Sequence, residues 1–552
     1  MTELLSAQQM RDIEKAAMDS GEVTGLELME RAGQGVVDAI LAEWPELQKG
    51  KRRAVVLCGP GNNGGDGFVI ARLLAEREWA VRVHLFGDPA KLPPDAKVNH
   101  DRWAADHGVL PMTADDVFAG ERPDVFVDAV FGIGLTRPLP EHVARALDVK
   151  GMKAWKRAHE IRRVAVDCPS GLDLDRGVVP SDMEPDDPEA DPWPRTLNVA
   201  ELTVTFHTPK LGHYLGLGPG LCRKLAIVDI GVGPFVPERA MVGMHPDSER
   251  VRLVAPTFAG TPLRPRMWPM SHIAKSRGMG HKFDHGHVIV FAGGVGRGGA
   301  ARMAARAALR AGAGLVTVLC PPAAVIENAC HLDAVMLRAL AKDQALAEVI
   351  DERVSGFVVG PGMGVSEWTR KRVIEVLGRR AEGAAHRDPI VVLDADALTS
   401  FEGDPQTLFA HTHGRTVLTP HEGEFGRLFP DLSGPARAGM SKIHAVRAAA
   451  DRAGCIVLVK GPDTVIAAPG GGASVHAAAY GREVPWLATA GAGDVLAGLI
   501  AGLGAPHTSS EAYAMTEIAA WLHVEAARRF GPGLIAEDLP EQLPGLFAEL
   551  SG

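Results

Sequence analysis

The stretch that decides the fold is residues 58–67, CGPGNNGGDG, which joins the apolar run RRAVVL to the amphipathic run FVIARLLAERE. The first run predicts a buried strand and the second a helix, with the glycines in the turn between them. Gly59, Gly61 and Gly64 have the G-x-G-x-x-G spacing of dinucleotide-binding loops. Because a glycine loop before a helix exposes backbone N–H groups, it suits an anion. The stretch therefore predicts an α/β unit with a ligand loop at a strand end.

Two interpretations of this loop stay open on the residues alone. A redox dinucleotide site needs an acidic residue about 20 positions further on, and Asp88 fits that spacing. Against it, Pro60 lacks an N–H, and Asp66 would face a pyrophosphate. Asn62, Asn63 and Asp66 instead suit a polar ligand. The plainer alternative is a tight turn in which Asp66 caps the helix.

The rest of the chain repeats this pattern in two series. Apolar runs such as DVFVDAVFG and RRVAVDCPSG come first, and runs such as HVIVFAGG, IVVLDADAL and CIVLVKG follow. Such strands, spaced by helices, are typical of parallel sheets covered on both faces. A chain of 552 residues is too long for one core. We expect domains at 1–235 and 276–552, a linker at 236–275, and an acidic surface insertion at 180–196.

Composition excludes several classes of function. A formal charge of −10 argues against nucleic-acid binding, which needs a basic face. The six cysteines form no C-x-x-C pair, so neither a zinc site nor a disulfide framework is expected. No uncharged apolar run is long enough to span a membrane, and the amphipathic, acidic N-terminus is unlike a signal peptide. We expect a cytoplasmic protein.

Oxygen-bearing residues gather at strand ends in the first series. Asp128 precedes a second glycine loop, and Asp167 and Ser170 stand in VAVDCPSGLD. Either aspartate alone is more often a loop or cap residue. Together with the Asn62–Asp66 loop, however, three such strand ends favour a site for a hard cation beside an anionic ligand.

The second series contains its sharpest motif in ATAGAGDVLAGLIAGL. Residues 490–493 open a helix with Asp494 in its first turn, and the free N–H groups there suit a phosphate. Asp494 is placed to deprotonate a hydroxyl that attacks this phosphate. Alone, the motif fits an ordinary helix start equally well. Lys460 and His421, taken singly, are more often a solvated lysine and a structural polar residue.

Five motifs of the first half are similar to one family: LMERAG, GPGNNGGDG, VDAVFGIG, DCPSGLD and LTVTFHTPKLGHY. They resemble the N-terminal half of the bifunctional NAD(P)H-hydrate repair enzymes, over roughly residues 1–235. The resemblance implies a Rossmann-like three-layer domain with NAD(P)HX epimerase activity, in which Asp167 is an acid/base candidate. It implies potassium on Asn63, Asp128 and Ser170. The implied substrate contacts are Asn62, Asn63, Gly64, Gly65, Asp66, Gly132, Ile133, Gly134, Leu135, Thr136, Arg137, Pro138 and Asp167. Ile133 stands where the family usually has threonine.

The ordered motifs GPGMG, DADAL, TPHEGE, KGPDT and GAGD resemble the ribokinase-like C-terminal half of the same enzymes, over roughly residues 276–552. The resemblance implies a dehydratase that uses ADP or ATP with magnesium. Phosphorylation turns the hydrate's hydroxyl into a leaving group, and elimination restores the ring double bond. The implied hydrate contacts are Ala300, Gly362, His421 and the catalytic Asp494; the nucleotide contacts are Lys460, Gly461, Pro462, Asp463, Thr464 and Gly493. Ala490 and Ala492 replace the family's glycine and threonine.

The leading hypothesis is therefore an epimerase fused to a dehydratase, acting on NADHX and NADPHX and forming a homo-oligomer. A ribokinase-like kinase for a small vitamin-precursor alcohol explains GAGD but not NNGGDG. A nucleotide sensor without turnover, or a binding scaffold in the first half, is a third class. A dehydrogenase built on Gly59–Gly64 is the weakest, because no second-domain motif supports it.

Overall fold

The structure, a computed structural model, falls into two compact units. It describes residues 2–149, 160–180, 199–236, 250–254, 257–258, 261–262, 275, 281–379, 388–437, 439–507 and 511–551. One unit is Glu3–Ala240, and the other is Met1–Thr2 with Met241–Gly552. The predicted acidic insertion lies outside the described residues after Pro180, as does most of the predicted linker.

The first unit is built on a sheet in the order β4-β3-β2-β5-β6-β7-β8. Every neighbouring pair in it is parallel. The strands are β2 (Arg53–Cys58), β3 (Ala80–Leu85), β4 (Val109–Pro111), β5 (Val125–Ala129), β6 (Arg162–Val166), β7 (Leu202–Phe206) and β8 (Leu225–Val228). Strands β5 and β7 are buried along their whole length, as the continuous apolar runs predict.

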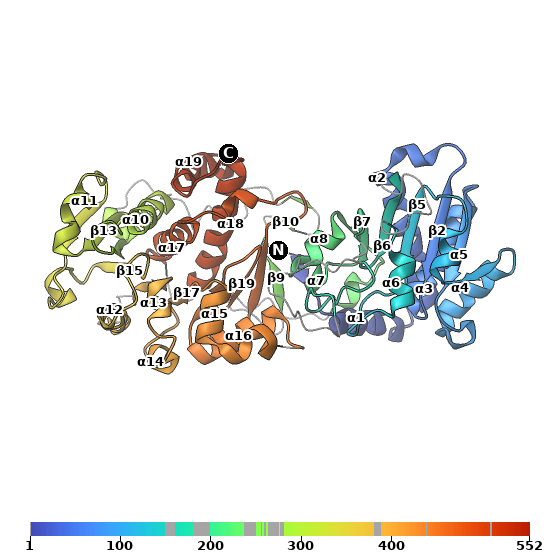
Figure 1. Cartoon of the computed structure of the whole chain (residues 1–552), viewed down its shortest axis with the longest axis horizontal. Coiled ribbons are helices and arrows are strands. Elements are labelled where there is room, and N and C mark those ends of the chain that lie inside the picture. Colours follow the sequence, from blue (N-terminus) through green and yellow to red (C-terminus); the bar gives the residue numbers. More distant parts are fainter. Residues whose placement is uncertain are drawn as a thin grey trace. The chain divides into compact units, whose positions relative to one another are not determined.

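Helices cover both faces of this sheet (Figure 1). They are α1 (Ala7–Asp19), α2 (Gly25–Glu43), α3 (Asn62–Ala75), α4 (Pro94–Ala104), α5 (Ala114–Phe118), α6 (Glu141–Leu147), α7 (Leu211–Tyr214) and α8 (Gly218–Cys222). Residues from α1 to α4 share one apolar core with the sheet, and residues from α5 and α6 share a second. The result is a three-layer domain. The short strand β1 (Thr2–Leu4) precedes α1.

The second unit has a larger sheet whose order runs β9-β20-β19-β18-β17-β16-β15-β12-β13-β14. The strands are β9 (Val251–Leu253), β12 (His287–Phe291), β13 (Leu315–Cys320), β14 (Met336–Ala339), β15 (Val354–Val359), β16 (Ile390–Leu393), β17 (Thr416–Leu418), β18 (Ile456–Val459), β19 (Asp463–Ala467) and β20 (Ala473–Ala477). From β14 to β18 all neighbours are parallel, so their carboxyl ends share one edge. Strand β19 is antiparallel to β18. A separate antiparallel pair joins β10 (Thr257–Phe258) and β11 (Thr261–Pro262).

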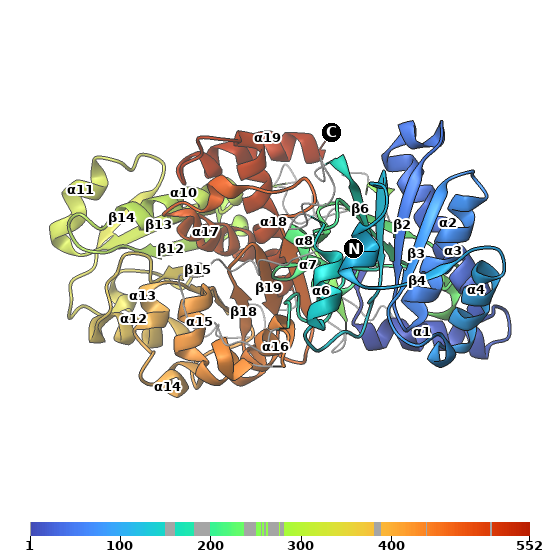
Figure 2. The same cartoon turned by 45° about the vertical axis from the view of Figure 1, so that its right-hand side comes forward.

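Two groups of helices flank this sheet, as the two views show (Figures 1 and 2). One face carries α10 (Gly299–Ala311), α17 (Ala492–Gly504), α18 (Ala512–Phe530) and α19 (Asp538–Ser551). The remaining helices are α11 (Val325–Ala329), α12 (Glu367–Leu377), α13 (Asp396–Thr399), α14 (Pro405–Phe409), α15 (Glu422–Leu428) and α16 (Lys442–Ala453). Alanine-rich α10 packs closely on α17, since a Cβ on Gly498 would lie 2.1 Å from the Ala304 carbonyl oxygen.

The predicted α/β fold class is confirmed in both units. Strand β9, inside the range predicted as a linker, pairs with β20, so the domain boundaries stay a prediction. Within the described residues, no helix is both long and apolar enough to cross a membrane. Five of the six cysteines are buried, and Cys330 is exposed.

Candidate active sites

The glycines of the opening loop have separate structural tasks. A Cβ on Gly59 would lie 1.8 Å from the Val130 carbonyl oxygen, and one on Gly64 would lie 2.0 Å from the Gly59 carbonyl oxygen. Both glycines therefore let α3 and the neighbouring loop pack tightly against the end of β2. A Cβ on Gly61 would meet nothing within 4 Å, and Gly61 lines a cavity. Asp88, the residue a redox dinucleotide site would need, instead caps the short helix Pro89–Lys91.

A cavity of about 640 Å³ opens at this edge of the first sheet. Most of the predicted epimerase residues line it: Asn62, Asn63, Asp66, Gly132, Ile133, Gly134, Leu135, Thr136, Arg137 and Asp167. Gly64, Gly65 and Pro138 are not among the lining residues. A Cβ on Gly65 would lie 2.5 Å from the sulfur of Met29, so this position, like Gly64, is needed for packing. Sequence reasoning missed Arg11 and Glu14, which α1 contributes to the wall.

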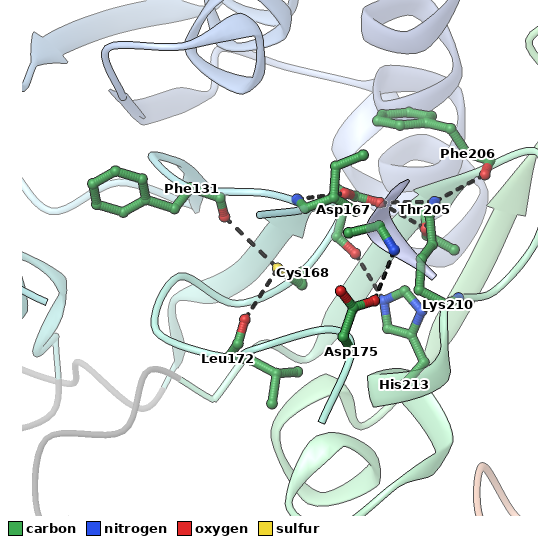
Figure 3. Close-up of polar contacts among 11 residues, drawn as sticks. Phe131, Asp167, Cys168, Leu172, Asp175, Thr205, Phe206, Lys210 and His213 are labelled. Atoms are coloured by element: carbon green, nitrogen blue, oxygen red, sulfur yellow. Dashed lines mark hydrogen bonds and ion pairs between the residues drawn. The ribbon is translucent and has the colours of Figure 1, made fainter. Parts of the chain in front are cut away.

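Asp167 is held as a carboxylate by a buried lysine (Figure 3). The Lys210 ammonium donates to Asp167 Oδ1 at 3.0 Å and to Thr205 Oγ1 at 2.7 Å, and Thr205 Oγ1 itself donates to Oδ1 at 2.8 Å. The backbone N–H of Ile133 donates to Oδ2 at 3.1 Å. Burial opposes the charge, but the charge of Lys210 and the hydrogen bonds from Lys210 and Thr205 lower the pKa of Asp167 below its ordinary value. Sequence reasoning missed Lys210, although it stands in a motif quoted above.

The backbone of Asp167 is fixed as firmly as its side chain. Its φ of 63° is left-handed, which is unfavourable for a residue other than glycine. The backbone N–H of Lys210 donates to His213 Nδ1 at 2.9 Å, so the His213 proton is on Nε2, which donates to the Asp167 carbonyl oxygen at 2.9 Å. Burial and Lys210 lower the pKa of His213 to about 4, which keeps this ring neutral. The strained backbone aims the Asp167 carboxylate at the cavity.

Two other carboxyl groups in this cavity have a raised pKa. Burial and the neighbouring Asp167 raise the pKa of Glu14 to about 7, against the opposing effects of Lys210 and Arg11. Burial, Glu14 and Asp167 raise the pKa of Asp66 well above its ordinary value. Asp66 is not the N-cap of α3, because Gly61 occupies that position. The cavity therefore holds one carboxyl with a lowered pKa beside two with a raised pKa, an arrangement suited to proton transfer.

The three predicted potassium ligands lie near one another. Ser170 Oγ donates to Asp128 Oδ1 at 2.6 Å and accepts from the Phe131 N–H at 2.8 Å. Gly132 directly follows Phe131, and a Cβ on Gly132 would lie 2.9 Å from the side-chain oxygen of Asn63. The Asn63 amide nitrogen is buried without a hydrogen-bond partner among the described residues. The side-chain oxygens of these three residues fit a hard monovalent cation, whereas the Asn63 amide nitrogen is a donor and would serve an oxygen of a ligand.

In the second unit, α17 begins against a lysine–aspartate pair. Lys460 directly follows β18, and Asp394 directly follows β16. The Lys460 ammonium donates to Asp394 Oδ1 at 2.6 Å. A Cβ on Gly493 would lie 3.3 Å from the Lys460 ammonium and 3.7 Å from Asp394 Oδ2. The Lys460 charge therefore lies at the N-terminus of α17, where free N–H groups also favour an anion.

Asp494, in the first turn of α17, has the properties of a general base at neutral pH. Burial and the charges of Asp394 and Asp396 raise its pKa to about 7, while Lys460 has the opposite effect. The DADAL motif had no assigned role, yet both of its aspartates shape this site. Asp396 also accepts the backbone N–H of Gly364 at 2.7 Å, which fixes the loop after β15.

The other predicted hydrate contacts lie at the same edge of the sheet. A Cβ on Gly362 would lie 3.7 Å from the Cβ of Ala300, so these two positions are neighbours. His421 caps α15: the Gly423 N–H donates to its Nδ1 at 3.0 Å, and its own N–H donates to Glu424 Oε2 at 2.9 Å. The His421 side chain is half exposed, and the His421 backbone forms an isolated parallel β-bridge with the backbone of Lys460.

A cavity of about 680 Å³ adjoins the N-terminus of α17. Five of the six predicted nucleotide contacts line it: Lys460, Gly461, Pro462, Thr464 and Gly493. The sixth, Asp463, does not, and its carboxylate accepts from Lys442 Nζ at 2.8 Å. Sequence reasoning missed His523 in this wall, whose Nε2 lies 2.8 Å from the Ala492 carbonyl oxygen. Burial lowers the pKa of His523 to about 4, so the ring is neutral and holds the start of α17.

The donors available for magnesium are the carboxylates beside Lys460. Asp394 Oδ1 lies 2.6 Å and Glu424 Oε2 4.0 Å from its ammonium. Among the described residues, no group of three or more histidine, cysteine or acidic side chains forms a ready metal site. A pair of carboxylates still fits magnesium, which usually takes one or two from the protein and the rest from phosphates and water.

Known protein families match each of the two units. The family described as YjeF-related protein N-terminus matches residues 25–212, and the family described as NAD(P)H-hydrate dehydratase matches residues 288–543. An NAD(P)H-hydrate epimerase of Roseobacter litoralis is 47% identical over 246 residues, covering all of that protein and 42% of this chain. An ADP/ATP-dependent NAD(P)H-hydrate dehydratase structure from Bacillus subtilis is 22% identical, with a TM-score of 0.43, over 54% of this chain and 99% of that one.

Full-length relatives span both units. The bifunctional NAD(P)H-hydrate repair enzyme Nnr of Coxiella burnetii is 32% identical over 548 residues, which cover 98% of either chain. The likeness therefore includes both candidate sites, in the same order along one polypeptide. This chain belongs to the family of bifunctional NAD(P)H-hydrate repair enzymes.

Proposed function

We propose that this chain interconverts the R and S hydrates of NADH and NADPH in its first unit, and dehydrates the S hydrate in its second. The predicted family and bifunctional enzyme class are confirmed by the full-length likeness. One observation supports the residue roles most strongly. Each candidate site contains a lysine–aspartate pair and a carboxyl whose pKa is raised to about 7.

The epimerase step requires proton transfer at the hydroxyl of the hydrate. Water added to the enamine double bond of the ring leaves its hydroxyl on the carbon bonded to the ring nitrogen. Glu14, whose pKa is raised to about 7, donates a proton as the C–O bond breaks, so water leaves and a C=N⁺ bond forms. Asp167 stabilises this cation and takes a proton as water adds to the other face. The product is the opposite epimer.

The dehydratase step is phosphoryl transfer followed by elimination. Asp494 takes the proton of the hydrate's hydroxyl, whose oxygen attacks the terminal phosphorus of ADP or ATP. The bond from that phosphorus to the rest of the nucleotide breaks. Phosphate then leaves the ring carbon as the adjacent carbon loses a proton, which restores the double bond. Lys460 and the α17 N–H groups balance the phosphate charge.

Two cations complete the proposal. Potassium on Asn63, Asp128 and Ser170 would hold the epimerase loops and offset the charge of an anionic substrate. Magnesium, held by Asp394 and Glu424 together with the nucleotide phosphates, would neutralise charge on the transferred group. A cytoplasmic location and a homo-oligomeric state stay predictions.

A coupled assay tests the function directly. The two hydrate epimers are followed separately by chromatography, with the purified chain alone, with ADP or ATP, and with magnesium. We expect epimer exchange without nucleotide and NADH formation only with nucleotide. A folded protein that regenerates no NADH with either nucleotide contradicts the dehydratase. A stable phosphorylated alcohol as product would instead support the vitamin-precursor kinase.

A further inference from the structure

A buried lysine lies behind residues 461–464 of the second unit, the nucleotide turn, and has no role in the function proposed above. Lys442 is the first residue of α16, and its side chain is only 6% exposed. The helix dipole disfavours a cation in the first turn of a helix, and burial of an ammonium group adds a desolvation cost. Lys442 therefore holds its position against two electrostatic penalties, which its partners must offset.

The partners of Lys442 come from two neighbouring elements. Its ammonium donates to the Asp463 carbonyl oxygen at 3.0 Å and to Asp463 Oδ1 at 2.8 Å. It also forms an ion pair with Glu422 Oε1 at 3.0 Å. Glu422 is the first residue of α15, which lies beside α16 in both views (Figures 1 and 2). One ammonium group thus joins the nucleotide turn to the start of α15.

The backbone of the nucleotide turn lies directly in front of this charge. A Cβ on Gly461 would lie 3.3 Å from Lys442 Nζ and 3.3 Å from Asp463 Oδ1. The Gly461 N–H donates to Thr464 Oγ1 at 3.3 Å, and the Thr464 hydroxyl donates to the Gly461 carbonyl oxygen at 2.9 Å. Gly461 and Thr464 line the 680 Å³ cavity, whereas Lys442 and Asp463 do not. The lysine–aspartate pair therefore lies directly behind the cavity wall.

An aspartate is an unfavourable residue in a turn that is to hold an anion. The phosphates of ADP and ATP are negatively charged, so a carboxylate close behind their binding loop repels them. A cation within hydrogen-bond distance of that carboxylate offsets the repulsion. Glu422 places a second carboxylate on the same ammonium group. Loss of the Lys442 charge would therefore leave two acidic groups beside one anion site.

We propose that Lys442 is a positioning residue of the dehydratase, which neutralises Asp463 and ties the nucleotide turn to α15 so that the turn can accept ADP or ATP. The proposal rests on the dehydratase function, in which this turn holds the phosphoryl donor. Asp463 then supports the turn from behind, in place of the direct nucleotide contact that the family resemblance implies. The ion pair with Glu422 also fixes the turn relative to His421, the residue before Glu422.

A double-variant cycle on the full chain tests the charge argument. Lys442→Met keeps most of the side-chain length but removes the charge, so the KM for ADP or ATP should rise about 10-fold. The KM for the hydrate should change by less than about 2-fold, because other residues hold the hydrate. Lys442→Met/Asp463→Asn also removes the carboxylate, so it should recover most of the lost affinity. A double variant as impaired as Lys442→Met would overturn the proposal.

Asp463→Asn alone distinguishes support of the turn from direct contact with the nucleotide. In this variant the Lys442 ammonium can still donate to the carbonyl oxygen of residue 463, so the turn should keep its place. The KM for ADP or ATP should therefore equal that of the wild type or fall. A rise of about 10-fold would mean that the Asp463 carboxylate itself binds the nucleotide or its magnesium, which contradicts the proposal.

Calorimetric titration of ADP with magnesium, without hydrate, separates this proposal from the dehydratase function. Lys442→Met should bind ADP about 10-fold more weakly than the wild type, and the double variant should recover most of the affinity. If these changes are seen but no hydrate is dehydrated, the proposed function fails and the role of Lys442 stands. Absence of ADP binding to the wild type contradicts the role of Lys442.

The matched control is Arg415→Met, which also removes a buried cation. Arg415 directly precedes β17, at the opposite end of that strand from His421, and donates to the Gly504 carbonyl oxygen at 2.9 Å. We expect Arg415→Met to lower the urea midpoint and to keep the ADP affinity of the wild type. An equal loss of ADP affinity in Arg415→Met and Lys442→Met would reveal a general effect on the fold and overturn the proposal.

Discussion

Lys210 and Lys460 each bind an aspartate at the end of a parallel strand, but the two pairs differ in their access to a ligand. The Lys210 and Asp167 side chains are only 1% and 6% exposed, and Lys210 does not line the epimerase cavity. Lys460 is 21% exposed and lines the nucleotide cavity, while its partner Asp394 is 2% exposed. A sealed lysine can only fix the state of its aspartate, whereas an open one can also meet a phosphate.

The same difference extends to the carboxyls beside the pairs. Glu14 and Asp494 both have a pKa raised to about 7, mainly by burial. In the proposed mechanism, the pair of the first unit supplies the base, Asp167, and Glu14 supplies the proton. In the second unit the pair would supply charge for the phosphate, and Asp494 would supply the base. We therefore propose that one set of parts serves proton exchange in one unit and phosphoryl transfer in the other.

The largest expected effect is at Asp494. Asp494→Asn removes the base but keeps the shape of the side chain, so dehydration should fall by about 10⁴-fold. Epimer exchange should be unchanged, because its cavity lies in the other unit. Both rates are measured on one protein sample by following the two hydrates with and without nucleotide. Loss of epimer exchange in this variant would contradict two separate sites.

The second prediction concerns the sealed pair. Lys210→Met leaves the Asp167 carboxylate buried without its cation, which should cost about 3–5 kcal/mol of unfolding free energy. It should also raise the pKa of Asp167 and abolish epimer exchange. The free energy of unfolding is measured by titration with urea. Unfolding is monitored through the loss of epimer exchange in the wild type and through fluorescence in the variants.

Matched variants sharpen this comparison. Lys210→Met/Asp167→Asn should recover most of the stability but none of the epimerase activity, because the buried charge is gone. Lys460→Met should cost less stability than Lys210→Met, since water reaches the site. An equal cost for both lysines would show that access to solvent does not distinguish the pairs.

The third prediction is a pair of opposite pH profiles. Glu14 acts as an acid, so epimer exchange should fall as pH rises through about 7 and Glu14 loses its proton. Asp494 acts as a base, so dehydration should fall as pH drops through about 7 and Asp494 gains one. Glu14→Gln should slow epimer exchange about 100-fold at pH 7 and remove this limb of its profile. Dehydration by the same variant is the control, and an unchanged epimerase profile would exclude Glu14.

The sequence was informative wherever function follows from position along a strand. Continuous apolar runs predicted the parallel sheets, and residues after strands such as Asp167 and Lys460 lie at the sites because parallel carboxyl ends meet at one edge. Glu14 had no such signal, because it lies on an amphipathic helix more than 150 residues before Asp167. The Lys210–Asp167 pair likewise joins residues 43 positions apart, and no local pattern reveals it.

The smallest expected effects separate two glycines of the same fingerprint. Gly64→Ala would place a methyl 2.0 Å from the Gly59 carbonyl oxygen, so the backbone must shift, at a cost of about 1–3 kcal/mol. Gly61→Ala meets nothing within 4 Å, and its φ of −119° suits any residue, so stability should change by less than about 0.5 kcal/mol. Because Gly61 lines the cavity, its methyl should instead raise the KM for epimer exchange a few-fold. Urea midpoints and epimerase kinetics on both variants decide this. If Gly61→Ala were the less stable of the two, the glycine spacing would serve the ligand and not the packing of α3 against β2.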